Sequence, residues 1–491
     1  MANRITQVRK LSDPELFEAH LEAIGADLGF DRSVDSGPRS PLAQPIAVPM
    51  GSAGSRTIGN RFAILPMEGW DATTDGRPTE HVIRRWNRFG ASGAKLIWGG
   101  EAIAVCDEGR ANPNQLRIGP DTIDDISNLR AGLVDQHRER FGTTDDFVVG
   151  LQLTHSGRYA RPAGALAPKI AYAHPWLDQR VQATPDDIVT DADLDHLVDL
   201  FVSAAELAES AGFDFVDVKS CHGYLLHELL SGFDRPGPYG GDFEGRSRFL
   251  RRTIEAIRQR VPRLGIGVRL SIFDLVPYSA GPDGTGAPEK PGNYRYAFGG
   301  DGTGLGINLE ESSRLVQLLT DLGVGLMCIT ASSPYYCPHA QRPAYFPPSD
   351  GYLPPNDPLV DVARLINATA ALKALHPDMV MVGSGYSYLQ DWLPNVAQSE
   401  VRNHRVDLVG IGRMALSYHD LPADILEGNQ IERRRICRTF SDCTTGPRNG
   451  LISGCYPIDD YYKQMPIRAE LAKAKRAADN ARGGSRPAGS D

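Results

Sequence analysis

Three polar side chains follow a short apolar segment near the middle of the chain. The segment 213-FDFVDVKS-220 reads as a buried strand, and Lys219, His222 and Tyr224 stand at its exit. An ammonium and an imidazole can hold a substrate oxygen, and a phenol can supply a proton. A loop rich in Gly and Pro follows, and 244-EGRSRF-249 then begins a helix. Polar donors at the carboxyl end of a strand, followed by a turn-rich loop, are typical of active sites in barrel enzymes.

Two later segments combine small residues with a cation. They are 383-GSGY-386 and 410-GIGR-413. Glycine lets backbone amides approach a phosphate closely, and an arginine offers a bidentate cation. Barrels commonly bind phosphate after their seventh and eighth strands. The alternative is that these glycines only allow tight packing. The pattern favours a phosphate site made of Gly383, Ser384, Gly385, Gly412 and Arg413.

Two other polar residues lie inside apolar runs. Gln152 stands in the middle of 147-FVVGLQLT-154, and Arg269 stands in 265-GIGVRLS-271. A buried amide needs hydrogen-bond partners, and a buried charge is costly unless it is paired. Either residue could satisfy a polar ligand, or each could serve a purely structural pairing in the core.

Eight short apolar segments must position these residues. They do not alternate with polar residues, as expected for strands buried on both faces. Helical patterns lie between them at 79–90, 191–212, 244–261, 307–323 and 358–375, and Thr190 is a plausible N-cap for the second. Eight strand–helix repeats predict an α/β fold, a (β/α)8 TIM barrel. The strands are expected at 61-RFAILPM-67, 95-KLIWGGEAI-103, 147-FVVGLQLT-154, 213-FDFVDVKS-220, 265-GIGVRLS-271, 324-VGLMCIT-330, 379-MVMVGSG-385 and 406-VDLVGIG-412.

The chain is predicted to have three parts. Residues 1–54 form an N-terminal extension, 55–426 form the barrel, and 427–491 form a C-terminal extension whose tail, from about Gly483, is expected to be disordered. Residues 275–306 form a long Gly- and Pro-rich loop of the length expected for a lid or a disordered segment. Within it, 299-GGDGTGLG-306 resembles a dinucleotide fingerprint but does not follow a strand, so we interpret it as loop.

Composition excludes several classes of protein. Of the 491 residues, 41% are hydrophobic and 23% charged, as in an ordinary soluble globular protein. A net charge of −9 argues against nucleic acid as a partner. The sequence has neither a run of 18 apolar residues nor an apolar N-terminal signal, so no membrane association is expected. Seven cysteines in so long a chain favour the cytoplasm. A small-molecule substrate is the expected partner, and self-association stays open.

Several of these motifs together resemble the Old Yellow Enzyme family of NADH:flavin oxidoreductases. HGYLLHELLS (222–231), then YGG (239–241) and E-x-R-x-RF (244–249), are similar to the family signature. The segment 151-LQLTHSGR-158 is similar to its QLxHxGR, and 61-RFAILPM-67 to its opening strand. The likeness spans roughly residues 55–420 and includes the barrel part of the 2,4-dienoyl-CoA reductase and trimethylamine dehydrogenase relatives. It implies FMN as cofactor, with NADH or NADPH as hydride donor.

The resemblance also implies roles for individual residues. It places Gln152 on the flavin pyrimidine edge and Arg269 near its N1–C2=O edge. It makes Lys219 and His222 hold the substrate carbonyl while Tyr224 delivers a proton. Lys219 departs from the family, where His is commoner, and Glu68 stands where relatives carry Cys, Thr or other residues. The remaining residues implied at the cofactor are Pro66, Met67, Glu68 and Ala102, and those implied at the substrate are Trp70 and Tyr335.

The C-terminal cysteines raise the question of a metal site. Larger relatives carry a C-x2-C-x3-C-x11-C pattern that binds a [4Fe–4S] cluster. Here Thr439 stands at the second position and Cys437 is displaced, while Cys443 and Cys455 keep the last spacing. A cluster usually needs four thiolates, so we expect no metal.

The predicted function is FMN-dependent transfer of hydride from NADH or NADPH, through flavin N5, to an activated alkene such as an α,β-unsaturated ketone. Two alternatives remain. One is an oxidative flavin dehydrogenase that demethylates an amine or desaturates a ring. The other is a flavin-free barrel lyase or hydrolase that uses Lys219 as a Schiff-base or basic residue.

Overall fold

The computed structural model describes residues 5–482 and contains a closed barrel of eight parallel strands. The predicted α/β-barrel fold is confirmed. Each strand pairs with its neighbours along the chain, and β13 returns to β3 to close the ring. The strands are β3 (Phe62–Ile64), β4 (Leu96–Ile97), β6 (Val148–Thr154), β7 (Phe215–Val218), β8 (Gly265–Ser271), β11 (Leu326–Thr330), β12 (Val380–Gly383) and β13 (Leu408–Ile411).

A layer of helices surrounds the barrel. Helices that follow the strands pack against the apolar outer face of the sheet. Helix α5 begins as expected at Thr190, whose hydroxyl accepts the Asp193 N–H within a capping box. The helices of this layer are α2 (Glu80–Gly90), α3 (Ile123–Phe141), α5 (Asp191–Ser210), α7 (Phe243–Arg260), α8 (Glu310–Asp321), α10 (Pro358–Leu375), α11 (Leu393–Arg402), α12 (Arg413–Ser417) and α13 (Leu421–Glu427). Three short helices lie in loops: α4 (Leu177–Val181), α6 (Leu225–Leu230) and α9 (Pro338–Gln341).

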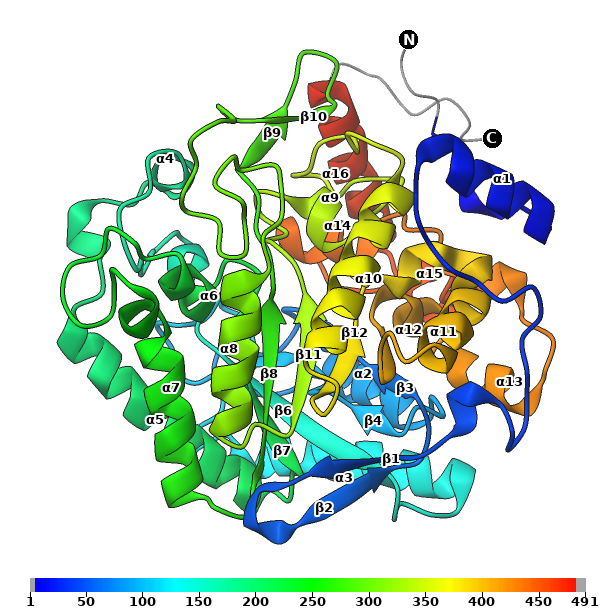
Figure 1. Ribbon diagram of the computed structural model, residues 1–491, viewed down its shortest axis with the longest axis horizontal. Helices are drawn as coiled ribbons and strands as arrows, with labels where there is room; N and C mark the ends of the chain where they lie inside the picture. The colour runs from blue at the N-terminus through cyan, green and yellow to red at the C-terminus, as the bar shows by residue number, and fades with distance from the viewer. Residues whose placement is uncertain (1–4, 483–491) are drawn as a thin grey trace.

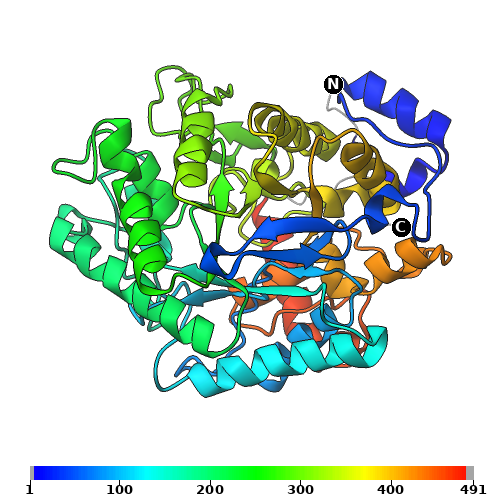
Figure 2. The same ribbon diagram turned by 60° about the horizontal axis from the view of Figure 1, so that its bottom comes forward.

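A two-stranded hairpin closes the amino end of the barrel. Strand β1 (Ile46–Pro49) pairs antiparallel with β2 (Ser55–Ile58), so the hairpin crosses residue 54, where the N-terminal extension was expected to end. Its apolar side chains Val48 and Ile58 pack against the side chains inside the barrel. The hairpin lies across the foot of the strands in Figure 1, and Figure 2 brings it to the front. Helix α1 (Pro14–Ile24) precedes it along the chain.

Three features differ from the expected elements. The second apolar segment is divided: β4 ends at Ile97, and β5 (Ala102–Ala104) then continues beside β6. Helices α3 and α11 follow strands where the helical pattern was weak. The long loop at 275–306 contains a small hairpin of β9 (Tyr278–Ala280) and β10 (Gly286–Pro288).

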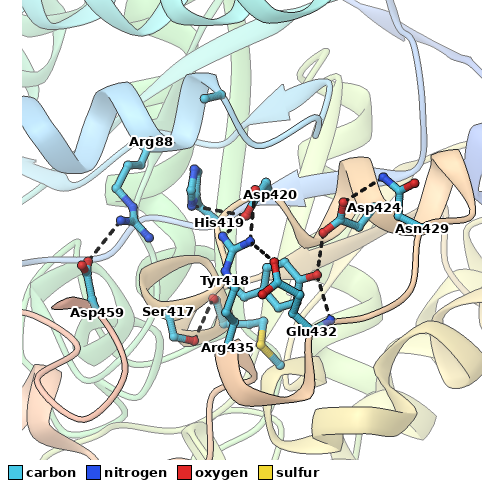
Figure 3. A network of polar contacts seen from close by, with 12 residues as sticks. Arg88, Ser417, Tyr418, His419, Asp420, Asp424, Asn429, Glu432, Arg435 and Asp459 are labelled. Carbon is cyan, nitrogen blue, oxygen red and sulfur yellow. Dashed lines mark hydrogen bonds and ion pairs between the residues drawn. The ribbon is translucent and has the colours of Figure 1, made fainter.

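The C-terminal helices α14 (Asp442–Arg448), α15 (Asp460–Lys463) and α16 (Arg468–Ala481) follow the last strand. Helices α14 and α16 lie at the end of the molecule toward which β8 and β11 point. The Asp459 carboxylate forms ion pairs with Arg84 and Arg88 of α2, with nitrogen–oxygen distances of 2.9–3.1 Å. Figure 3 shows the ion pair between Arg88 and Asp459 beside a network in which Arg435 pairs with Asp420 and Glu432. The tail expected to be disordered, from Gly483, lies outside the described residues.

Within residues 5–482, none of the helices has the length and apolar character needed to cross a lipid bilayer.

Candidate active site

Lys219 and Tyr224 lie together at the carboxyl end of β7, and a carboxylate joins them. The Lys219 ammonium donates to Glu68 Oε1 at 2.6 Å, and the Tyr224 hydroxyl donates to Glu68 Oε2 at 3.1 Å. The ammonium also lies 4.0 Å from the centre of the Tyr224 ring. Burial, and next the Glu68 charge, raise the pKa of Tyr224 well above its usual range. Tyr224 therefore keeps its proton at neutral pH.

His222 lies beside them in a left-handed backbone conformation, with φ +66°. Its N–H donates to Ser271 Oγ at 3.1 Å, and Ser333 Oγ donates to its carbonyl at 2.8 Å. Its Nε2 lies 3.0 Å from Gln341 Nε2 and 3.3 Å from Thr330 Oγ1. Burial, followed by the charges of nearby cations, lowers the pKa of His222 well below its usual range. The imidazole is therefore neutral and carries one donor proton.

A buried carboxylate beneath these residues holds Gln152. Asp217 Oδ2 accepts from Gln152 Nε2 at 2.6 Å and from Trp98 Nε1 at 2.6 Å. Its Oδ1 accepts the Arg269 backbone N–H at 2.6 Å. Burial raises the pKa of Asp217 to about 6. Strands β6, β7 and β8 thus share one polar centre inside the barrel. Its hydrogen bonds fix the Gln152 side chain and the Arg269 backbone.

The predicted donors and most of the predicted cofactor residues face one hollow at the carboxyl end of the barrel. Its first part encloses about 710 Å³, open mouth included, and holds the Lys219, His222 and Tyr224 side chains. Its second part, of about 640 Å³, lies beside the predicted phosphate residues. The two parts share Pro66, Met67, His222, Arg269, Gln341, Arg342 and Thr444. A molecule with a planar ring at one end and an anionic group at the other therefore has continuous space here.

Unpartnered buried nitrogens in this hollow provide a test of whether FMN fits. Among the described residues, no hydrogen-bond partner is present for Arg269 Nε, Arg413 Nη1 and two nitrogens of Arg342, Nε and Nη2. Burial, followed by the charges of Arg448 and Arg413, lowers the pKa of Arg342 to about 10. Buried cationic donors are costly unless an anion or acceptor satisfies them. A phosphate near Arg413 and Arg342, and a carbonyl-rich ring edge near Arg269, supply such acceptors, so these residues fit FMN.

The predicted phosphate residues line the second part of the hollow. Ser384, Gly385, Gly412 and Arg413 all face it. Gly385 has a φ of +95°, a conformation that side chains disfavour, so a glycine is required there. Gly383 ends β12 directly before this group. Arg413 donates through Nη2 to the Pro343 carbonyl at 2.7 Å, and its buried Nη1 has no hydrogen-bond partner among the described residues.

The structure places the other predicted residues in two ways. Pro66, Met67, Glu68, Trp70 and Tyr335 all line the first part of the hollow. Ala102 instead begins β5 beside Gln152, and its carbonyl accepts from Gln115 Nε2 at 2.9 Å. Ala102 lines neither part of the hollow.

The signature residue Arg158 has a structural partner. Arg158 forms a buried ion pair with Glu228 and another with Asp178. It does not face the hollow that holds Tyr224. Arg158 therefore serves a structural pairing.

The first part of the hollow is also lined by residues that were not among those predicted, including Gln341, Arg342, Cys443, Thr444 and Arg448. Gln341 and Arg342 belong to the aromatic, proline-rich segment after β11. The other three belong to the C-terminal extension. No spacing relates them to the barrel strands, so sequence patterns offered no signal for them. Cys443 faces the hollow, and the expected absence of iron at the C-terminal cysteines stays a prediction.

Comparison with known proteins agrees with this geometry. Residues 42–284 match the NADH:flavin oxidoreductase / NADH oxidase family. The chain is 33% identical over 233 residues to an NADPH dehydrogenase of Geobacillus sp., an alignment that covers 45% of this chain and 62% of that protein. It is 23% identical over 442 residues to an NADH oxidase of Thermoanaerobacter brockii, covering 86% of this chain and 58% of the relative. The matched part thus amounts to about three fifths of the length of these curated relatives.

Solved structures share the fold. A 2-naphthoyl-CoA reductase complex aligns with a TM-score of 0.61 and 18% identity, covering 88% of this chain and 58% of its own. An Old Yellow Enzyme homologue from Zymomonas mobilis aligns with a TM-score of 0.51 and 20% identity, covering 79% of this chain and 93% of its own. The sequence motifs, the barrel and the ring-and-phosphate hollow thus agree with the match of residues 42–284 to the NADH:flavin oxidoreductase / NADH oxidase family, and the residues of the hollow fit FMN.

Proposed function

We propose that this protein uses FMN to pass hydride from NADH or NADPH to an activated alkene conjugated to a carbonyl group. The observation that carries the proposal is the common hollow in which Lys219, His222 and Tyr224 face Gln152 and Arg269. Oxygen-binding donors and a proton donor thus lie beside the residues that fit a flavin ring. When bound, FMN supplies the hydride-transfer chemistry.

The chain's own residues would orient the substrate and move one proton. The Lys219 ammonium and the neutral His222 ring would donate hydrogen bonds to the substrate carbonyl oxygen. Negative charge that develops on this oxygen is stabilised by donors already in place. Tyr224, protonated because burial and Glu68 disfavour its anion, would give its hydroxyl proton to the α-carbon. Trp70 and Tyr335 would form apolar walls and exclude water.

Other residues would hold the cofactor. Arg413 and Arg342 would bind its phosphate, with the Gly385 and Gly412 backbones close by. Arg269 and Gln152 would meet the polar edge of the ring, since Asp217 fixes the Gln152 amide. This arrangement offers a place for one phosphate and favours FMN over FAD.

Spectroscopy on the purified protein tests the proposal. We expect flavin absorbance, release of FMN on denaturation, anaerobic bleaching by NADH or NADPH, and return of colour when 2-cyclohexenone is added. Saturated cyclohexanone serves as the control oxidant and should not restore the colour. Released FAD, or the absence of flavin after reconstitution with FMN, would contradict the cofactor assignment. Bleaching by amines rather than by NADH or NADPH would favour the oxidative alternative.

A further inference from the structure

A carboxylate stands among the donors that would hold the substrate oxygen. Glu68 contacts Lys219 through one oxygen and Tyr224 through the other, at 2.6 and 3.1 Å. The Lys219 side chain is 3% exposed and Glu68 is 19% exposed, so the pair is largely removed from water while Glu68 still reaches the hollow. In such a setting one charge strongly affects a second charge a few ångströms away.

The loop that carries Glu68 is itself held in place. Gly69, which follows Glu68 in the chain, donates its backbone N–H to Glu101 Oε2 at 3.1 Å. Arg85 of α2 forms buried ion pairs with both Asp71 and Glu101. Buried Arg–carboxylate contacts with several hydrogen bonds are geometrically specific. The position of Glu68 therefore follows from a fixed loop and does not depend on Lys219 alone.

The other cations around the first part of the hollow are compensated differently. Arg269 and Arg342 keep unpartnered nitrogens that fit FMN. Arg448 pairs with Asp350, whose side chain is 43% exposed and does not line this part of the hollow. Among the described residues that line it, Glu68 is the one acidic side chain. The charge that Glu68 cancels is thus the charge of the substrate-facing Lys219.

We infer that Glu68 determines the charge selectivity of the substrate site. By compensating the Lys219 ammonium, it makes the donor set favour an uncharged carbonyl oxygen over an anionic ligand, such as a phenolate or a carboxylate. Lys219 keeps the ability to donate a hydrogen bond, but an incoming anion meets the repulsion of the Glu68 carboxylate. The inference rests on the proposed function in taking Lys219 and His222 as the donors that bind a carbonyl oxygen.

Ligand binding to the FMN-loaded enzyme tests this inference. Calorimetry would compare 4-nitrophenolate, at a pH where it is ionised, with 4-nitrobenzaldehyde, an uncharged carbonyl of similar size. We expect Glu68→Gln to tighten the binding of 4-nitrophenolate by about tenfold or more, because the Lys219 charge is then uncompensated. Binding of the aldehyde should change by less than about threefold.

The same substitution in a protein that lacks the Lys219 ammonium shows whether Glu68 acts through Lys219. In a Lys219→Met protein, adding Glu68→Gln should change the preference for phenolate over aldehyde far less than it does in the presence of Lys219, as in a double-mutant cycle. Glu255→Gln, which removes an exposed charge on α7, is the control and should leave both affinities unchanged. An equal effect of Glu68→Gln with and without Lys219, or an equal effect on both ligands, would overturn the inference.

The outcome of this binding experiment can be distinguished from the outcome of the spectroscopic test of the proposed function. A wild-type enzyme that is not reoxidised by 2-cyclohexenone, yet shows the Lys219-dependent shift in phenolate affinity, would lose the proposed reaction and keep the charge selectivity. An enzyme that reduces the enone but shows no such shift would keep the reaction and lose the role of Glu68.

Discussion

At the scale of single residues, Tyr224 combines the two properties that a late proton donor needs. Its hydroxyl reaches the hollow, where it lies 3.1 Å from Glu68 and 3.3 Å from the Tyr335 hydroxyl. Burial and the neighbouring carboxylate hold its pKa well above the usual range, so the proton stays on the phenol until a stronger base forms. A carbanion-like α-carbon is such a base.

Tyr224→Phe should therefore separate the two halves of the reaction. We expect FMN binding and flavin reduction by NAD(P)H to stay within about threefold of wild type. Reoxidation by an enone should slow by roughly 10²–10⁴-fold, which is the usual contribution of a general acid. Anaerobic stopped-flow absorbance measures both half-reactions. Tyr335→Phe, which removes the neighbouring hydroxyl, is the matched control and should slow reoxidation by less than about tenfold. Wild-type reoxidation in Tyr224→Phe would remove Tyr224 from the mechanism.

At the scale of elements, Asp217 links three adjacent strands. It accepts hydrogen bonds from side chains of β6 and of the segment after β4, and from the backbone of β8. These contacts set the orientation of Gln152. The ordinary pKa of an aspartate is near 4, and burial raises the pKa of Asp217 to about 6.

This shift gives Asp217 a testable pH dependence. Between about pH 4 and pH 6 the folded protein retains a proton that the unfolded chain has released. The contribution of Asp217 to the free energy of unfolding therefore falls as pH rises through this window, by up to roughly 3 kcal/mol. Urea unfolding of wild type and Asp217→Asn at several pH values measures the difference between them. We expect wild type to lose stability relative to the variant as pH rises from 4 to 6. A constant difference across this range would contradict the assigned pKa.

At the scale of the whole molecule, the C-terminal extension supplies one wall of the hollow. Cys443, Thr444 and Arg448 face it. Ion pairs attach the extension to the barrel, including those of Asp459 with Arg84 and Arg88 of α2. A stacked contact adds to them, since the Arg448 guanidinium lies 4.3 Å from the centre of the Tyr335 ring.

Weakening this attachment should loosen the wall. Asp459→Asn leaves two partly buried arginines without a countercharge, and we expect it to lower the free energy of unfolding by about 1–3 kcal/mol. Cleavage by trypsin within residues 433–482 should become faster, and the affinity for FMN should fall. The neighbouring Asp460, whose side chain is 80% exposed and pairs with Lys463, provides the control variant Asp460→Asn. Equal effects of the two substitutions on unfolding and cleavage would show that the Asp459 contacts do not hold the extension.

Much of the architecture follows from local patterns. Apolar strand segments and helices such as α5, with its cap at Thr190, appear in the sequence because hydrophobic periodicity and capping depend on residues close together in the chain. The motifs around His222 and Arg413 likewise indicate strand ends with particular chemistry. The division of the second strand was not predicted, and helices α3 and α11, which the eight strand–helix repeats require, have only weak helical patterns in the sequence.

The sequence by itself determined the barrel, and it predicted a resemblance to a flavin oxidoreductase family and a set of candidate residues for a flavin site. Only the tertiary structure decided how those residues pair. Glu68 and Lys219 lie 151 positions apart, and Arg448 reaches the hollow from beyond the last strand. Local sequence does not encode such contacts, because they form only when the barrel closes and brings the carboxyl ends of all eight strands to one face. The same closure leaves two nitrogens of Arg342, Nε and Nη2, buried without hydrogen-bond partners among the described residues, which makes Arg342 a candidate anion ligand.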